Sequence, residues 1–249
     1  FNRSISDIYC AVLPAERQGE VPHRYVLGLY EFLDRLGKRY SDMLIEGCSG
    51  GGGRFDAGML HYTSQIWCSD DTDAIERLKI QYGTSFAYPV SAVGSHVSAC
   101  PNHQTGRIVP FESRATVAMA GTFGYELDPA KLSEEEKQQI QEQIAEFKKY
   151  YDVIHFGNYY RLTNAMEEGP YAAWEFAKED GSEALVSVVA SRVCTNDPGV
   201  RIKLRGLKEN QMYLVNGVEY PGGALMHGGL LLEEAKKEYQ SWNYHIVMK

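Results

Sequence analysis

Two short bursts of polar residues, each placed directly after an apolar run, carry the residue types that could do chemistry. The first burst reads CSGGGGRFD over residues 48–56, and the second reads SDDTD over residues 69–73. A carboxyl group held at the end of a strand can give or take a proton, which makes Asp70 a candidate general acid or base. Aspartates also favour helix starts, so spacing alone leaves both roles open for Asp70. Asp73 is better explained as a helix cap, and Asp71 as a solvated charge of the first turn.

The run of four glycines at 50–53 could bring the backbone close to a ligand and present its N–H groups. It lacks the Lys-Ser/Thr ending of a phosphate loop and the spaced glycines of a dinucleotide loop. A merely flexible loop is the alternative, and composition alone favours it. The position of the run at a strand end, between Cys48 and Arg54, favours a binding loop.

Cysteine chemistry and a metal site are both poorly supported. A cysteine nucleophile needs a histidine base, and Cys48 and Cys68 fit no known local pattern, so packing is the better explanation for both. No metal or other cofactor is expected, because three histidines lack the spacing of a ligand pair: His61, His96 and His103. His96 could contact substrate or lie in the core, and Trp67 is expected to lie partly in the core.

Short strands that alternate with helices must position these bursts. Strands are predicted at 43–46, 65–69, 90–97 and 122–125, and helices at 23–40, 56–62, 73–82, 111–119 and from Ser133 onward. Residues 1–22 are predicted to form a loop. Asp73 with Glu76 and Ser133 with Glu136 have the spacing of capping boxes, and Gly83 is a predicted helix stop. Chemistry in such α/β folds gathers at the carboxyl ends of the strands, so both bursts should face one pocket.

Beyond residue 155 the pattern changes to short strands separated by turns. Strands are predicted at 185–193, 201–207, 212–215, 230–232 and 244–248, with turn signals such as Asp180-Gly181 and Asn216-Gly217 between them. The prediction is an α/β protein with two domains. Residues 1–158 would form the second half of a (β/α)8 TIM barrel, because about four strand–helix units are present where a closed barrel needs eight. Residues 159–249 would form a C-terminal all-β sandwich.

The composition argues against some classes of binding partner. The formal net charge of −8 over 249 residues argues against nucleic acid and anionic membranes as partners. Five scattered cysteines suggest a reducing compartment, so a cytoplasmic location is expected. The chain begins with Phe1 instead of Met, which suggests the C-terminal part of a longer enzyme.

The two bursts resemble the α-galactosidases of glycoside hydrolase family 36. The similarity is carried by CSGGGGRFD at 48–56 and WCSDDTDAIERLKIQYGTS at 67–85, with FNRS at 1–4 and GSHVS at 94–98. It covers most of residues 1–125 and is loose beyond residue 155.

The resemblance implies a retaining mechanism, in which one carboxylate attacks the anomeric carbon and another acts as acid and then base. Asp70 matches the acid/base, and Asp71, often Asn in relatives, should be dispensable. The nucleophile would be the Asp of a Lys-Trp-Asp motif directly before Phe1. The pattern C-x-x-G-x-G-R, the adjacent loop backbone and the remaining Asn of that motif give the expected sugar-binding residues: Asn2, Cys48, Ser49, Gly50, Gly51, Gly53 and Arg54.

The expected activity of the intact enzyme is therefore a retaining exo-α-galactosidase acting on melibiose- or raffinose-type galactosides. A transglycosylase similar to raffinose synthase and a non-catalytic sugar-binding fragment remain the alternatives. The 249 residues alone are expected to be inactive without the N-terminal half of the enzyme. The resemblance also implies a homo-oligomer, with a tetramer as the expected form.

Overall fold

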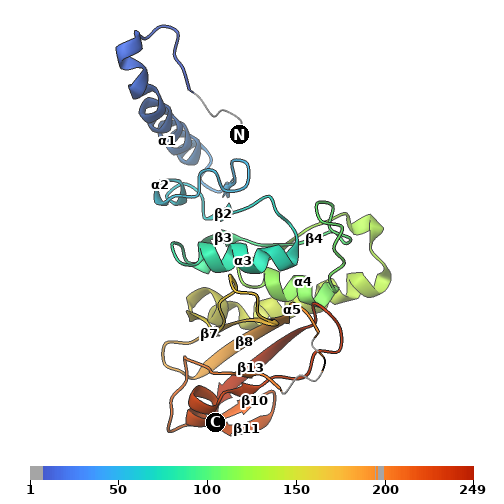
Figure 1. Ribbon diagram of the computed structural model, residues 1–249. Helices are drawn as coiled ribbons and strands as arrows, with labels where there is room; N and C mark the ends of the chain where they lie inside the picture. Colours follow the sequence, from blue (N-terminus) through green and yellow to red (C-terminus); the bar gives the residue numbers. More distant parts are fainter. Residues whose placement is uncertain (1–7, 194, 196–198) are drawn as a thin grey trace. The chain divides into compact units, whose positions relative to one another are not determined.

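The computed structural model describes residues 8–193, 195 and 199–249 (Figure 1). It divides into two compact units, one ending at Asp70 and the other beginning at Asp71. The predicted position Asn2 lies outside the described residues. No helix in these ranges combines the length and hydropathy needed to cross a bilayer.

The first unit contains a long helix, a short helix and one pair of strands. Its elements are η1 (Ala15–Glu20), α1 (Val21–Arg39), β1 (Glu46–Gly47), α2 (Ala57–Leu60) and β2 (Gln65–Trp67). Strands β1 and β2 are parallel, with Gly47 opposite Ile66. A small core of Leu33, Met59 and Ile66 holds the helices against this pair. Parallel pairing next to helices is what the sequence pattern predicts for this region.

Two predictions for the first unit are wrong in their limits. The predicted strand at 43–46 begins only at Glu46, where the pairing with β2 starts. Leu44 is 88% exposed, whereas Ile45 packs against the small core of the unit. The predicted loop before Pro22 becomes helical from Ala15 onward. Pro22 lies in the first turn of α1, where its missing N–H costs no hydrogen bond.

The second unit begins with helices and short strands. They are α3 (Ala74–Thr84), η2 (Val90–Ala92), β3 (Val93–Gly94), β4 (His96–Ser98), α4 (Phe111–Ala118), β5 (Gly124–Glu126), η3 (Pro129–Lys131) and α5 (Glu134–Phe156). The strand predicted at 90–97 is thus divided into three short elements. Strands β4 and β5 are parallel. The capping box at Ser133 is confirmed: its Oγ accepts from the Glu136 N–H, and the Glu136 carboxylate accepts from the Ser133 N–H.

A six-stranded antiparallel sheet follows, in the order β11-β10-β13-β8-β7-β6. Its strands are β6 (Asn158–Arg161), β7 (Tyr171–Ala177), β8 (Glu183–Ala190), β10 (Met212–Val215), β11 (Val218–Pro221) and β13 (Ser241–Met248). Strands β9 (Arg201–Ile202) and β12 (Leu230–Leu231) form a separate pair, and η4 (Ala224–Gly228) is a short π-helix. The predicted β-rich C-terminal region is confirmed, but β6, β7 and β11 were not predicted.

The two faces of the sheet are covered differently. Alternate residues of β7 and β8, such as Phe176 and Leu185, pack in one core cluster with Val153 and Ile154 of α5. Their neighbours on the opposite face pack in a second cluster with residues of β9, η4 and β12. The period of two along each strand produces this division. A helix, as well as strands, therefore covers the sheet.

Candidate active site

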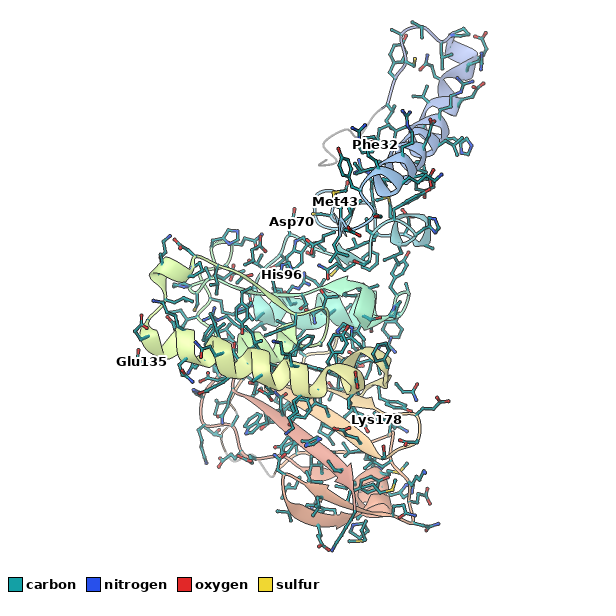
Figure 2. All side chains as sticks on the ribbon, turned by 180° about the vertical axis from the view of Figure 1, so that it is seen from behind. Phe32, Met43, Asp70, His96, Glu135 and Lys178 are labelled. Atoms are coloured by element: carbon teal, nitrogen blue, oxygen red, sulfur yellow. The ribbon has the colours of Figure 1, made fainter. Side chains whose placement is uncertain are left out.

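Asp70 lies on the loop that directly follows β2 (Figure 2). Its Oδ1 accepts a hydrogen bond of 3.1 Å from the indole nitrogen of Trp67. The thiol sulfur of Cys48 lies 3.9 Å from the same oxygen. The ends of the two paired strands are thereby brought together, as the sequence predicts for the carboxyl edge of a parallel sheet.

The glycine run forms a left-handed turn beside this carboxylate. Four successive residues have positive φ: Ser49 at 69°, Gly50 at 66°, Gly51 at 69° and Gly52 at 83°. The N–H of Gly53 donates to the carbonyl oxygen of Ser49 over 3.2 Å and closes the turn. Residues with side chains avoid consecutive left-handed conformations, so this path requires the glycines.

The same glycines allow a close approach to the strand end. A Cβ atom on Gly51 would lie 2.8 Å from the backbone nitrogen of Asp70, and one on Gly52 would lie 2.7 Å from the carbonyl oxygen of Cys68. Contacts this short do not occur for real Cβ atoms. The loop is therefore a fitted part of the site and not merely a flexible connection.

Ser49 adds a hydroxyl group that has no partner within the described part of the chain. The residue is 4% exposed, and its Oγ makes no hydrogen bond there. A buried hydroxyl left without a partner costs about 1–3 kcal/mol, so a hydrogen bond from a ligand would recover that cost. The predicted role of Ser49 in sugar binding remains a prediction that this geometry favours.

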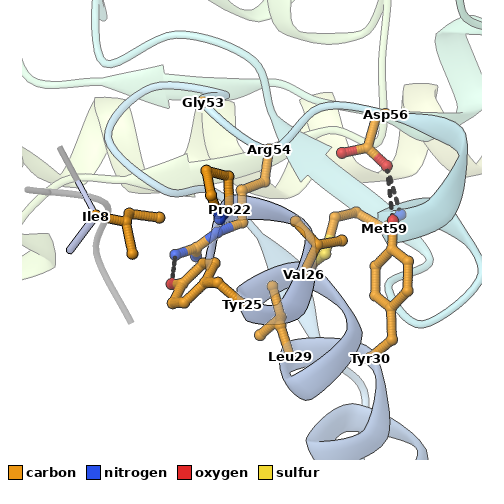
Figure 3. Close-up of a pocket in the computed structure, with 10 residues that line it drawn as sticks. All are labelled: Ile8, Pro22, Tyr25, Val26, Leu29, Tyr30, Gly53, Arg54, Asp56 and Met59. Atoms are coloured by element: carbon orange, nitrogen blue, oxygen red, sulfur yellow. Dashed lines mark hydrogen bonds between the residues drawn. The ribbon is translucent and has the colours of Figure 1, made fainter. Parts of the chain in front are cut away.

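Arg54 faces α1, where it lines a cavity of about 250 Å³ (Figure 3). Its Nη2 donates to the hydroxyl of Tyr25 over 2.8 Å, and its guanidinium lies 5.9 Å from the centre of the Tyr25 ring. Asp56 caps α2 on the same side by accepting from the N–H of Met59. The other lining residues are mostly apolar, among them Val26 and Leu29. The structure thus gives Arg54 a partner on α1, and its predicted sugar contact stays a prediction.

The aspartates after Asp70 have structural partners within the second unit. Asp71 accepts from the N–H of Asp73, and Asp73 caps α3 by accepting from the N–H of Ile75. The prediction that Glu76 completes a capping box with Asp73 is wrong, because the Glu76 carboxylate lies 3.2 Å from the Arg107 guanidinium instead. Helix α3 also continues one residue past the predicted stop at Gly83.

Asp73 is 1% exposed and is held by three kinds of donor. Its Oδ2 lies 2.7 Å from Nη1 of Arg107 and accepts from the Thr105 hydroxyl. Burial alone would raise the pKa of Asp73, but the hydrogen bonds from Thr105 and Ile75 and the charge of Arg107 outweigh it, so the pKa is lowered. Asp73 therefore stays charged as a structural anchor.

The structure also places Trp67 and His96, two residues that the sequence analysis singled out. Trp67 was expected to pack partly in the core; it is 6% exposed, and its N–H reaches Asp70, a bond that the i, i+3 spacing could have suggested. His96 lies with its Nδ1 3.5 Å from the carboxylate of Glu126. Within the described ranges, no group of three or more His, Cys, Asp or Glu residues is placed to hold a metal.

Two family models match this chain. The Melibiase family model matches residues 1–157, and the model of the glycosyl hydrolase family 36 C-terminal domain matches residues 171–246. The two models together match most of the chain, and the class of protein that they define is a glycoside hydrolase family. The chain belongs to glycoside hydrolase family 36.

Similar proteins are α-galactosidases. The bifunctional α-galactosidase/sucrose kinase AgaSK of Mediterraneibacter gnavus is 54% identical over 98% of this chain and 25% of its own length. The α-galactosidase AgaA of Geobacillus stearothermophilus is 48% identical over 98% of this chain and 34% of its own length. A crystal structure of an AgaA variant in complex with raffinose matches 98% of this chain and 34% of its own with a TM-score of 0.94, at 46% identity. The chain therefore spans only a quarter to a third of the length of these relatives.

Proposed function

We propose that these residues belong to an α-galactosidase that releases terminal α-linked galactose from raffinose- and melibiose-type sugars. The observation that carries this proposal is the position of Asp70, between the Trp67 indole and the left-handed glycine turn. The names of the relatives and the raffinose complex of AgaA support the substrate class.

In the proposed mechanism, Asp70 protonates the glycosidic oxygen as the bond to the anomeric carbon breaks. A second carboxylate, from a residue outside this chain, attacks that carbon and forms a glycosyl-enzyme. Asp70 then takes a proton from water, which attacks the glycosyl-enzyme with overall retention. The glycine turn, with Cys48 and Ser49, would hold the galactose hydroxyls beside Asp70. Because the glycines have no side chains, a sugar ring can approach the backbone of the turn, whose N–H groups can donate hydrogen bonds to it.

The architecture and assembly are part of the same proposal. Residues 1–158 would form half of a (β/α)8 barrel, and the parallel pairs β1–β2 and β4–β5 support this. Residues 159–249 would form a C-terminal all-β sandwich, which the packing of the β9–β12 pair in one core cluster with residues of the six-stranded sheet supports. We further propose a cytoplasmic location and a homo-oligomer, with a tetramer as the expected form. Size measurement of the full-length protein would test the oligomer.

The deciding experiment replaces Asp70→Asn in the full-length protein. Turnover of melibiose should fall at least a thousandfold, on the order of the loss expected for a general acid, since its leaving group needs a proton. Asp71→Asn is the matched control and should stay near the unaltered rate. A near-normal melibiose rate for Asp70→Asn would refute the assignment. A product mixture dominated by transfer to other sugars would instead indicate a transglycosylase.

A further inference from the structure

We infer that Trp67 is a positioning residue for Asp70, and that its indole N–H fixes which carboxylate oxygen delivers the proton. The inference rests on the proposed function, because it assigns a role to a neighbour of the proposed acid/base. Trp67 would not touch the substrate; it would act through Asp70.

The hydrogen bond has a fixed direction. An indole N–H can only donate, so Oδ1 of Asp70 is the accepting atom of the 3.1 Å contact. The Cys48 thiol, 3.9 Å from the same oxygen, is oriented as a second, weaker donor. Donors to Oδ1 favour that oxygen as the accepting one, so in this proposal Oδ2 carries the proton that is transferred.

The donor is rigid. Trp67 is 6% exposed, and the preceding residue, Ile66, is fully buried in the small core of the first unit. Trp67 ends β2, whose pairing with β1 fixes the backbone. Because this donor is already fixed in place, little reorganisation energy is needed when negative charge develops on Asp70.

Asp70 is held from a second direction by the glycine turn. Gly51 lies so close that a Cβ atom there would be 2.8 Å from the backbone nitrogen of Asp70. The turn therefore restrains the backbone of Asp70, while the indole restrains its side chain. Together they select one orientation of the carboxyl group, which is the condition for efficient proton transfer.

The consequence for the reaction concerns the first step. The Oδ2–H bond breaks and the proton goes to the glycosidic oxygen, which keeps the electron pair of the bond it loses to the anomeric carbon. Asp70 becomes a carboxylate in this step, and the Trp67 N–H bond strengthens as the charge appears on Oδ1. The bond is thus stronger in the transition state than in the ground state, which is the requirement for raising the rate.

The test replaces Trp67→Phe in the full-length enzyme, which keeps an aromatic ring and removes the N–H. The ratio kcat/KM, which reports the first step, should fall on the order of 10- to 100-fold for melibiose, whose leaving group needs the proton. For 2,4-dinitrophenyl α-galactoside, whose leaving group departs without a proton, it should change less than about threefold. A Trp67→benzothienylalanine variant, which keeps the two-ring shape but has no N–H, should show the same split.

Trp174→Phe is the matched control, because Trp174 is also 6% exposed but lies in β7 of the second unit. Trp174→Phe should lower the melting temperature without changing the ratio of kcat/KM for melibiose to kcat/KM for 2,4-dinitrophenyl α-galactoside. An equal loss for both substrates in Trp67→Phe, or a benzothienylalanine variant with full melibiose activity, would overturn the positioning role. If Asp70→Asn itself kept its melibiose turnover, the proposed function would fail first, so the two failures are distinguishable.

Discussion

Gly52 lies against Cys68 so closely that a Cβ atom on the glycine would stand 2.7 Å from the Cys68 carbonyl oxygen. They are sixteen positions apart in the sequence, and the contact joins the glycine turn to the end of β2. The glycine run is therefore explained by two independent needs, a positive φ and the absence of a side chain.

Replacement of Gly52→Ala should disrupt the site through both effects. The positive φ costs about 1–2 kcal/mol for a residue with a Cβ, and the clash forces the turn away from Cys68. Gly106→Ala is the matched control, because Gly106 has φ of 71° with nothing within 4 Å of its Cβ position. In calorimetry and galactoside kinetics on the full-length protein, only Gly52→Ala should lose activity. Equal effects of the two replacements would show that backbone conformation alone explains the glycine.

The buried carboxylate of Asp73 should make the start of α3 sensitive to acid. Because the pKa of Asp73 is lowered by its donors despite burial, the unfolded chain binds more protons than the folded one. Its stabilising contribution is present above about pH 4, the ordinary range of an aspartate, and is lost as the pH falls through the lowered value.

Asp73→Asn should remove this dependence and cost about 1.5–3 kcal/mol at neutral pH, because the hydrogen-bonded charge beside Arg107 is lost. The N–H of Ile75 is a local probe, and its hydrogen exchange, corrected for the intrinsic rate at each pH, should report the change. Asp71→Asn is the control, since an asparagine keeps the side-chain oxygen that accepts from the Asp73 N–H. Identical pH profiles for Asp73→Asn and the unaltered protein would contradict the assignment.

Glu175 should produce the opposite dependence in the C-terminal sheet. It is fully buried in β7 and accepts from the N–H groups of Arg205 and Gly206 over 2.8 Å and 3.0 Å. Burial raises its pKa, and these two donors and the Arg205 charge only partly oppose the shift. The folded state therefore keeps its proton to a higher pH than the unfolded state. Stability should fall as the pH rises from about 4, the ordinary range of a glutamate, through the raised value.

Glu175→Gln should flatten that slope, because an amide does not titrate. Exchange protection of the Arg205 and Gly206 amides, followed across pH, measures the effect locally. Glu219→Gln, on the exposed edge strand β11, is the control and should leave the slope intact. If the pH dependence of stability persisted in Glu175→Gln, another titrating group would be its cause.

Elements defined by local signals could be predicted from the sequence. The capping box of Ser133 and Glu136 satisfies its own backbone within one turn, so α5 begins where the pattern places it. The Asn216-Gly217 pair likewise gives the hairpin between β10 and β11 its turn, with φ of 47° and 89°. Strand β7 was missed because all seven of its residues are buried, so it shows no alternation.

The sequence by itself determined the motif, the candidate acid Asp70, the glycine run and the family to which they belong. These depend on residue types and on short spacings, which the order of residues contains. The tertiary structure decided that Trp67 donates to Asp70, that the glycine turn rests on Cys68, and that Arg54 faces Tyr25. All three contacts depend on side-chain orientation or close packing, and the glycine contact also depends on the parallel pairing of β1 with β2. The i, i+3 spacing of Trp67 and Asp70 is compatible with their hydrogen bond, but residue order alone does not fix these contacts, because backbone conformation and packing determine them together.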